Sequence, residues 1–210
     1  MKHHLLYTFM IASLIMFAEC SYKQPGRKYF IFEFTNQDYP SVQRADTTFD
    51  VIVDVRDFRV ARAFDQTRIA IRTQSNELNY YYYHHWAVRP SYAIPALVYD
   101  YFEYKNAFRR INRGISYNPD YIIIGEVKSI ERIQTRAGDV AHTHIIFEFQ
   151  QADNEIAVVK HEATLTDKLD DPSMNRFVKT LNTSLVFTLE TFKEKIMNYL
   201  ENHADNRQTK

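Results

Sequence analysis

Three histidines in neighbouring segments are the residues of this chain whose types and spacing first suggest chemistry. His142 and His144 are two residues apart, so they share a face if their segment is a strand. His161 lies in the next extended segment and could complete a set of three nitrogen ligands of the kind that binds zinc. Whether the three histidines meet depends on how the two segments pair.

The side chains of the two segments predict that pairing. Val140 to Gln150 and Ile156 to Thr166 form a hairpin around a three-residue loop, 153–155. Charge meets charge and apolar meets apolar when Glu148 pairs with Lys160, Phe149 with Val159, and Ile145 with Ala163. His161 then lies on the apolar face beside Phe147, away from the other two histidines. We therefore expect exposed histidines and no metal site.

Catalytic motifs give no better candidate. The sequence has no nucleophile elbow, phosphate-binding loop, dinucleotide fingerprint or His-Glu-x-x-His motif. Its carboxylates, such as Asp54, Asp57, Asp65 and Glu126, are scattered and are best interpreted as solvated or ion-paired groups. We expect a protein that is not an enzyme and needs no cofactor. A hydrolase is the alternative that a deep pocket with converging acids would support.

Seven consecutive ring side chains, Tyr80 to Trp86, contain the only tryptophan of the chain. Bases could stack on such a stretch, but single-stranded nucleic acid also needs a cationic groove for its phosphates. The 26 basic and 26 acidic residues balance to a formal net charge of zero, and only Arg89 follows the rings directly. No nucleic-acid partner is expected.

The elements that must position these residues alternate between strands and helices. Strands are expected at Lys28–Phe34, Phe49–Val55, Arg68–Arg72 and Leu78–Tyr83, and a central strand from Tyr121 to Arg132. A helix capped by Ser91 runs to Phe108, and a long terminal helix starts at Asp171-Pro172. Its apolar face comprises Met174, Phe177, Val178, Leu181, Leu185, Phe192, Ile196 and Tyr199. The pattern predicts an α/β class: one three-layer-like domain with a mixed sheet, a mid-chain helix and a long C-terminal helix.

The N-terminus indicates export. Residues 1–19 have a short basic start and an uncharged stretch from Leu5 to Ala18, which is typical of a signal peptide. Cys20 is the only cysteine of the 210 residues and directly follows this region, as the lipid acceptor of a bacterial lipoprotein does. Because Glu19 departs from the usual lipoprotein pattern, an uncleaved N-terminal anchor is the alternative. We expect a lipidated tether at 20–27, one domain at 28–204 and a disordered tail at 205–210.

The order of short motifs resembles the ABC-type transport auxiliary lipoproteins, the periplasmic partners of MCE-protein lipid transporters. The motifs are Val55-Arg56-Asp57-Phe58, Ala63 to Arg72, the tyrosine strand with Trp86-Ala87 and Pro90, the Leu97 to Phe102 helix, and Tyr121 to Val127. Two positions depart from the family pattern, Gln66 after Phe64-Asp65 and Val88 after Trp86-Ala87.

The resemblance implies a non-enzymatic accessory subunit of an MCE/ABC-type system that moves lipid between membranes and supports envelope integrity. Its partners would be an MCE-domain protein and the ABC transporter or permease subunits, with association into a homo-oligomer as a further expectation. It would be an outer-membrane lipoprotein facing the periplasm of a Gram-negative bacterium. The alternative is a stand-alone envelope lipoprotein with a structural or assembly role.

The resemblance also assigns the aromatic stretch to a strand that turns into a helix. The tyrosines then alternate, with Tyr80 and Tyr82 on one face and the other two on the opposite face. One set is expected in the core. The other set, which we take to be Tyr80 and Tyr82, is expected to form an exposed partner contact with Arg89 and a half-buried Trp86.

Overall fold

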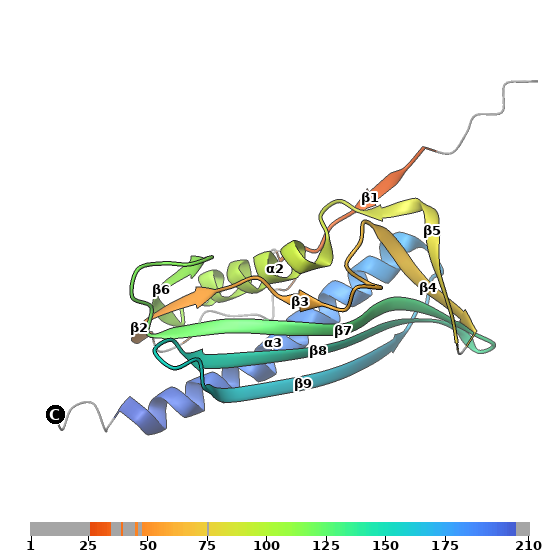
Figure 1. The fold of residues 1–210 in the computed structure, drawn as a ribbon. Helices are drawn as coiled ribbons and strands as arrows, with labels where there is room; N and C mark the ends of the chain where they lie inside the picture. Colours follow the sequence, from red (N-terminus) through yellow and green to blue (C-terminus); the bar gives the residue numbers. More distant parts are fainter. Residues whose placement is uncertain (1–25, 35–38, 40–44, 46–47, 75, 205–210) are drawn as a thin grey trace, which may run out of the picture.

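A computed structural model describes residues 26–34, 39, 45, 48–74 and 76–204, and the statements below refer to these residues. The predicted signal peptide, Cys20 and the C-terminal tail lie outside them. The described residues form nine strands and two helices, arranged as Figure 1 shows. The strands are β1 (Lys28–Phe30), β2 (Phe49–Val55), β3 (Arg59–Val60), β4 (Arg68–Gln74), β5 (Glu77–Trp86), β6 (Phe108–Arg113), β7 (Tyr121–Thr135), β8 (Gly138–Gln151) and β9 (Ala157–Lys168). The helices are α2 (Pro90–Lys105) and α3 (Met174–Ala204). The predicted α/β class is confirmed, with a mixed sheet, a mid-chain helix and a long C-terminal helix.

Strand β7 is the centre of the mixed sheet. One of its edges pairs with β8 along almost its whole length, and β8 pairs with β9. Its other edge is shared by three shorter parallel partners: β2 at Tyr121–Ile123, β3 at Glu126–Val127 and β4 at Arg132–Ile133. The strand path β1-β5-β4-β7-β2-β6 therefore has β1 at one end and β6 at the other.

Both helices cover the same face of this sheet. Val55, Ile123, Phe149 and Val159 occupy neighbouring positions on four adjacent strands and are all buried. Directly paired residues point to the same side of a sheet, so this row marks the core face. Helix α3 runs along β7 to β9 on this face (Figure 1), where Phe192 stacks on Phe147 with ring centroids 5.3 Å apart. Phe102 of α2 meets the same Phe192 ring edge-on, so the sheet and both helices share one core.

The hairpin register predicted from the sequence is confirmed. Glu148 pairs with Lys160, Phe149 with Val159, and Ile145 with Ala163. The predicted apolar face of the terminal helix is confirmed too, since its members are buried except for Tyr199, which is half-buried.

The helix ends differ from the predictions. Arg89 is the N-cap of α2 and makes no side-chain cap, so Ser91 is not the capping residue. Instead, the Ser91 backbone N–H donates to the carboxylate of Asp65 at 3.3 Å. At the other end, Asn106 adopts the left-handed conformation that commonly ends helices, and the predicted helical residue Phe108 begins β6.

Helix α3 is capped by Ser173 rather than by Asp171. The Ser173 Oγ accepts a hydrogen bond from the Arg176 N–H at 3.2 Å, as an N-cap side chain does three residues before its donor. Asp171 in turn accepts bonds from the Ser173 N–H and hydroxyl, at 2.9 Å and 2.6 Å, and fixes the cap.

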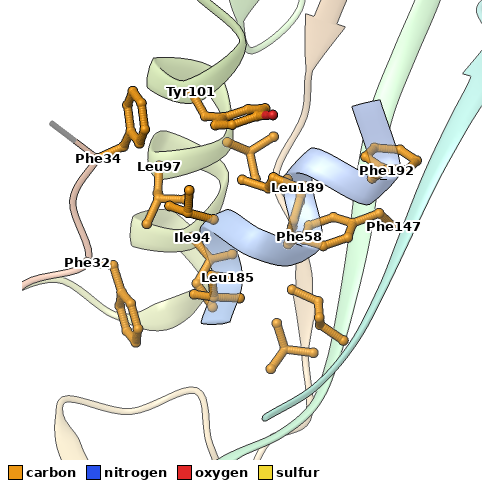
Figure 2. Close-up of a cluster of buried hydrophobic side chains, with 14 of the residues drawn as sticks. Phe32, Phe34, Phe58, Ile94, Leu97, Tyr101, Phe147, Leu185, Leu189 and Phe192 are labelled. Atoms are coloured by element: carbon orange, nitrogen blue, oxygen red, sulfur yellow. The ribbon is translucent and has the colours of Figure 1, made fainter. Parts of the chain in front are cut away.

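The N-terminal strand is shorter than predicted. β1 ends at Phe30, and residues 31–34 leave the sheet so that Phe32 and Phe34 pack against α2 and the aromatic core (Figure 2). The short strands β3 and β6 have no strong apolar run and were not predicted. Tertiary pairing places them in the sheet, with β3 along β7 and β6 along β2.

Gly125 in β7 leaves the space that the Phe58 ring occupies. A Cβ at this position would lie 2.4 Å from Phe58 Cε2, and Phe58 is itself held against Phe147 in the core (Figure 2). We expect Gly125→Ala to lower the free energy of unfolding by about 1–3 kcal/mol, because the ring must move in a packed core. Urea denaturation measures this change. Gly26→Ala is the control, since a Cβ there meets nothing within 4 Å; equal stability of the two variants would contradict the prediction.

Candidate functional site: the aromatic strand and an apolar loop

Trp86 lies in the core, and the expectation of a half-exposed tryptophan is corrected. Only 1% of its surface is exposed. Its indole packs on Phe32 with centroids 4.3 Å apart and faces Phe177 of α3 at 6.5 Å. The side chain therefore has no surface to offer a partner in this structure.

The tyrosines of β5 do not alternate as predicted, because the strand bulges. β4 pairs Ala70 with Tyr80 and then Arg68 with His85, so two steps along β4 match five along β5. The extra residues rotate the chain, as β-bulges do. Tyr82 becomes 70% exposed, while Tyr80 stays half-buried and its hydroxyl donates to the Ala63 carbonyl at 3.1 Å.

Of the four residues predicted to contact a partner, two are accessible. Tyr82 and Arg89 are exposed, Tyr80 is half-buried beneath the Arg68 guanidinium, and Trp86 is buried. Partner contact through Tyr82 and Arg89 stays a prediction.

The confirmed register keeps His161 away from His142 and His144, which share the opposite face. His144 Nε2 lies 2.7 Å from Glu162 Oε1, and His142 Nδ1 lies 3.0 Å from Thr166 Oγ1. His161 pairs with Phe147 instead and lies 3.1 Å from Lys195 Nζ. Burial lowers the pKa of His142 and of His161. Within the described ranges no group of three or more His, Cys, Asp or Glu could hold a metal ion, and the absence of metal in the protein stays a prediction.

The four carboxylates considered for catalysis each have a separate partner. Asp65 accepts from the Ser91 N–H, Asp57 lies 3.6 Å from Arg113, and Glu126 pairs with Lys128 at 2.6 Å. The Lys128 hydrogen bond lowers the pKa of Glu126. Asp54 accepts hydrogen bonds from Asn112 and Ser116.

Asp54 is fully buried and holds the loop between β6 and β7. Its carboxylate accepts hydrogen bonds from the Ser116 N–H at 2.7 Å, the Ser116 hydroxyl at 2.6 Å and the Asn112 side-chain amide at 3.1 Å. The Gly114 N–H donates to the Val55 carbonyl, and the Asp120 N–H donates to the Ile52 carbonyl, each at 2.9 Å. The loop, residues 114–120, is thus fixed in its middle and at both ends.

This fixed loop presents two large apolar side chains to solvent. Ile115 is 85% exposed and Tyr117 is 98% exposed, and we call residues 114–120 the apolar loop. The β8–β9 turn adds a third exposed apolar residue, Ile156, and is joined to the loop by a bond from the Ala152 N–H to the Asp120 carbonyl at 3.1 Å. Sequence reasoning missed this feature, although apolar residues beside Gly114 and between turn-forming residues were a signal for it.

The arrangement supports binding rather than bond-making chemistry. A hydrophobic tip that is held in place by buried hydrogen bonds loses little conformational freedom when it binds an apolar surface. The tip follows β6, at the end of the strand path opposite to β1 (Figure 1). Neither described helix is long and apolar enough to cross a membrane.

Comparison with known proteins assigns the chain to a family. A crystal structure of protein XCC0632 from Xanthomonas campestris has 16% identity and a TM-score of 0.64, covering 79% of this chain and 94% of that one. The crystal structure of an uncharacterized protein has 10% identity and a TM-score of 0.63, covering 81% and 99%. At these identities the likeness concerns the fold. A search of curated protein sequences finds no match. The model of the ABC-type transport auxiliary lipoprotein component family matches residues 33–187, and the chain therefore belongs to this family.

Proposed function

We propose that this protein is a non-enzymatic docking subunit of an MCE-type ABC transport system that moves phospholipid or another hydrophobic molecule between membranes. A lipid on Cys20 holds it to the outer membrane, and the domain projects into the periplasm. The ATPase, the permease and the MCE-domain protein are separate chains. Family membership supports the transport role, and the structure supports docking as its means.

The apolar loop carries this proposal. Ile115 and Tyr117 are the most exposed of the large apolar side chains that the structure describes, and adjoining exposed apolar side chains offer a surface for a partner. Three hydrogen bonds to the buried Asp54 carboxylate keep Ile115 and Tyr117 in that position. Because the loop follows β6 and β1 is at the opposite end of the strand path, a chain anchored through the residues before β1 would direct the loop away from its own membrane.

The test is co-purification with the transport components from native membranes. The double variant Ile115→Ser/Tyr117→Ser should recover at least about tenfold less MCE-domain protein and permease, because central apolar contacts commonly contribute 2 kcal/mol or more. Its free energy of unfolding should stay within about 0.5 kcal/mol of wild type, since both side chains are already exposed.

Two controls distinguish the alternatives. Tyr82→Ser tests the partner contact predicted for Tyr82 and Arg89; loss of partners in this variant and not in the double variant would place the contact on the aromatic strand instead of the apolar loop. Cys20→Ser should release the protein from the membrane fraction, and unchanged membrane association would contradict the lipid anchor. If the wild type recovers no transporter component, the stand-alone envelope lipoprotein is favoured.

A further inference from the structure

A groove separates β1 from the first turns of α3. It is a cavity of about 300 Å³ whose walls are a strand edge on one side and a helix on the other. The helix wall consists of Asn175, Val178, Lys179 and Asn182, which lie on one face of α3 at successive turns. The strand wall includes Tyr29, Phe30 and Ile31.

The strand edge that faces the groove is unpaired. Among the described residues, β1 pairs only with β5, and the Phe30 carbonyl accepts the Ala87 N–H at 2.7 Å on that side. Backbone groups of successive residues in a strand point to opposite sides. The N–H and C=O groups of Tyr29, the middle residue of β1, therefore point away from β5, and Tyr29 lines the groove.

The opposite wall holds a buried amide without a partner. Asn182 is 7% exposed, and its Oδ1 accepts no hydrogen bond from any residue that the structure describes. The next buried polar side chains of α3 are satisfied, since Ser184 donates to the Thr180 carbonyl at 2.8 Å and Thr188 donates to the Ser184 carbonyl at 2.9 Å. An unpaired buried amide lowers stability, and Asn182 lines the groove, so a ligand that donates a hydrogen bond to its Oδ1 would be stabilised there.

We propose that this groove binds an extended peptide segment of a partner protein. A peptide placed between the walls would pair its backbone with Tyr29 on one side, as in β-strand addition. On its other side the peptide presents one N–H and one C=O. The Asn182 carboxamide can rotate about its terminal torsion, so its oxygen can accept from this N–H and its NH₂ can donate to this C=O. The inference goes beyond the docking proposal and does not depend on it.

The groove lining also sets the composition of the peptide. Tyr29 and Ile31 are exposed apolar side chains at its mouth, so the peptide carries an apolar residue there. Glu33 and Lys179 are the charged lining residues and balance each other, which favours a segment of low net charge.

Phage display tests the proposal. A random library of twelve-residue peptides is selected against the detergent-solubilised full-length protein. Enriched peptides should be extended, of low net charge, and bound by wild type with an affinity that fluorescence anisotropy measures. Asn182→Leu should weaken this binding at least about tenfold, because it removes both polar atoms of the amide. The melting temperature of the same variant should equal that of wild type or exceed it by about 2–4 °C, because the exchange removes an unpaired buried polar group.

Matched variants make the result decisive. Asn202→Leu makes the same exchange at an exposed position of α3 and should change neither affinity nor melting. Ile31→Ser at the strand side should weaken peptide binding without lowering the melting temperature. A melting temperature of Asn182→Leu well below wild type would show that the amide has a structural partner and would overturn the proposal. So would the absence of enriched peptides, or equal affinity of wild type and Asn182→Leu. A concentration-dependent dimer that Asn182→Leu abolishes would assign the groove to a second copy and overturn the partner peptide.

Discussion

Trp86→Ala is expected to lower the free energy of unfolding by about 3–5 kcal/mol, as large-to-small exchanges of core aromatic residues do. The indole is 1% exposed and lies between Phe32 of the N-terminal segment and Phe177 of α3. Its removal would open a cavity where three parts of the chain meet, and neither a strand nor a long helix can readily collapse into it. Urea denaturation with far-UV circular dichroism measures the loss.

Tyr82→Ala is the control for this prediction. It removes another ring from the same strand, but one that is 70% exposed, so the change should stay within about 0.5 kcal/mol. Equal effects of the two variants would contradict the burial of Trp86. Loss of partner binding in Trp86→Ala would therefore not indicate that Trp86 contacts the partner, because a destabilised variant loses partners by unfolding.

Glu190→Gln is expected to destabilise the protein by about 3–5 kcal/mol through a buried lysine. Lys105 Nζ lies 2.7 Å from Glu190 Oε1, and the lysine is buried at the end of α2. Burial lowers the pKa of Lys105, while the hydrogen bond and the charge of Glu190 oppose that shift. Without the carboxylate, the ammonium group remains in the interior facing a neutral amide, and the desolvation of the charge is no longer offset.

Two further measurements identify the cause. Lys105→Met/Glu190→Gln should be more stable than Glu190→Gln alone, because the double variant no longer contains the Lys105 ammonium group that would lack its partner. Glu194→Gln, an exposed position on the same helix, should have little effect. A double variant no more stable than the single one would contradict the electrostatic explanation.

The stability loss in Glu190→Gln should also depend on pH. A lysine whose folded pKa is lowered binds fewer protons in the folded than in the unfolded state between the two pKa values, so stability rises with pH in this range. The loss should therefore shrink as the pH approaches 10.5, the ordinary lysine value. A loss that stays constant up to that pH would indicate a packing effect instead.

Local patterns determined the parts of this protein in which one face is apolar over many residues. The β8–β9 register follows from the sequence because a slip by one residue would turn Phe149 to solvent and separate Glu148 from Lys160. The buried face of α3 follows from helical spacing for the same reason, since rotating the helix would expose Leu181 and Leu185 together.

Features that depend on contacts between distant segments were decided only by the tertiary structure. The alternation of the tyrosines failed because β4 imposes a bulge on β5, and nothing within the stretch itself encodes that partner. Trp86 is buried because Phe32 and α3 close over it, and β6 is a strand because β2 offers it an edge.

For the candidate site too, some features could be predicted from the sequence and others only from the tertiary structure. The sequence by itself determined the absence of the catalytic motifs, the resemblance to auxiliary lipoproteins and the single cysteine at Cys20. It could not reveal that Asp54, 62 residues before Ser116, fixes the apolar loop, or that Asn182 faces the edge of β1. A carboxylate or an amide has the same appearance in a sequence whether it is solvated or buried. Only the folded chain decides which polar groups lose water, and hence which of them must find a partner.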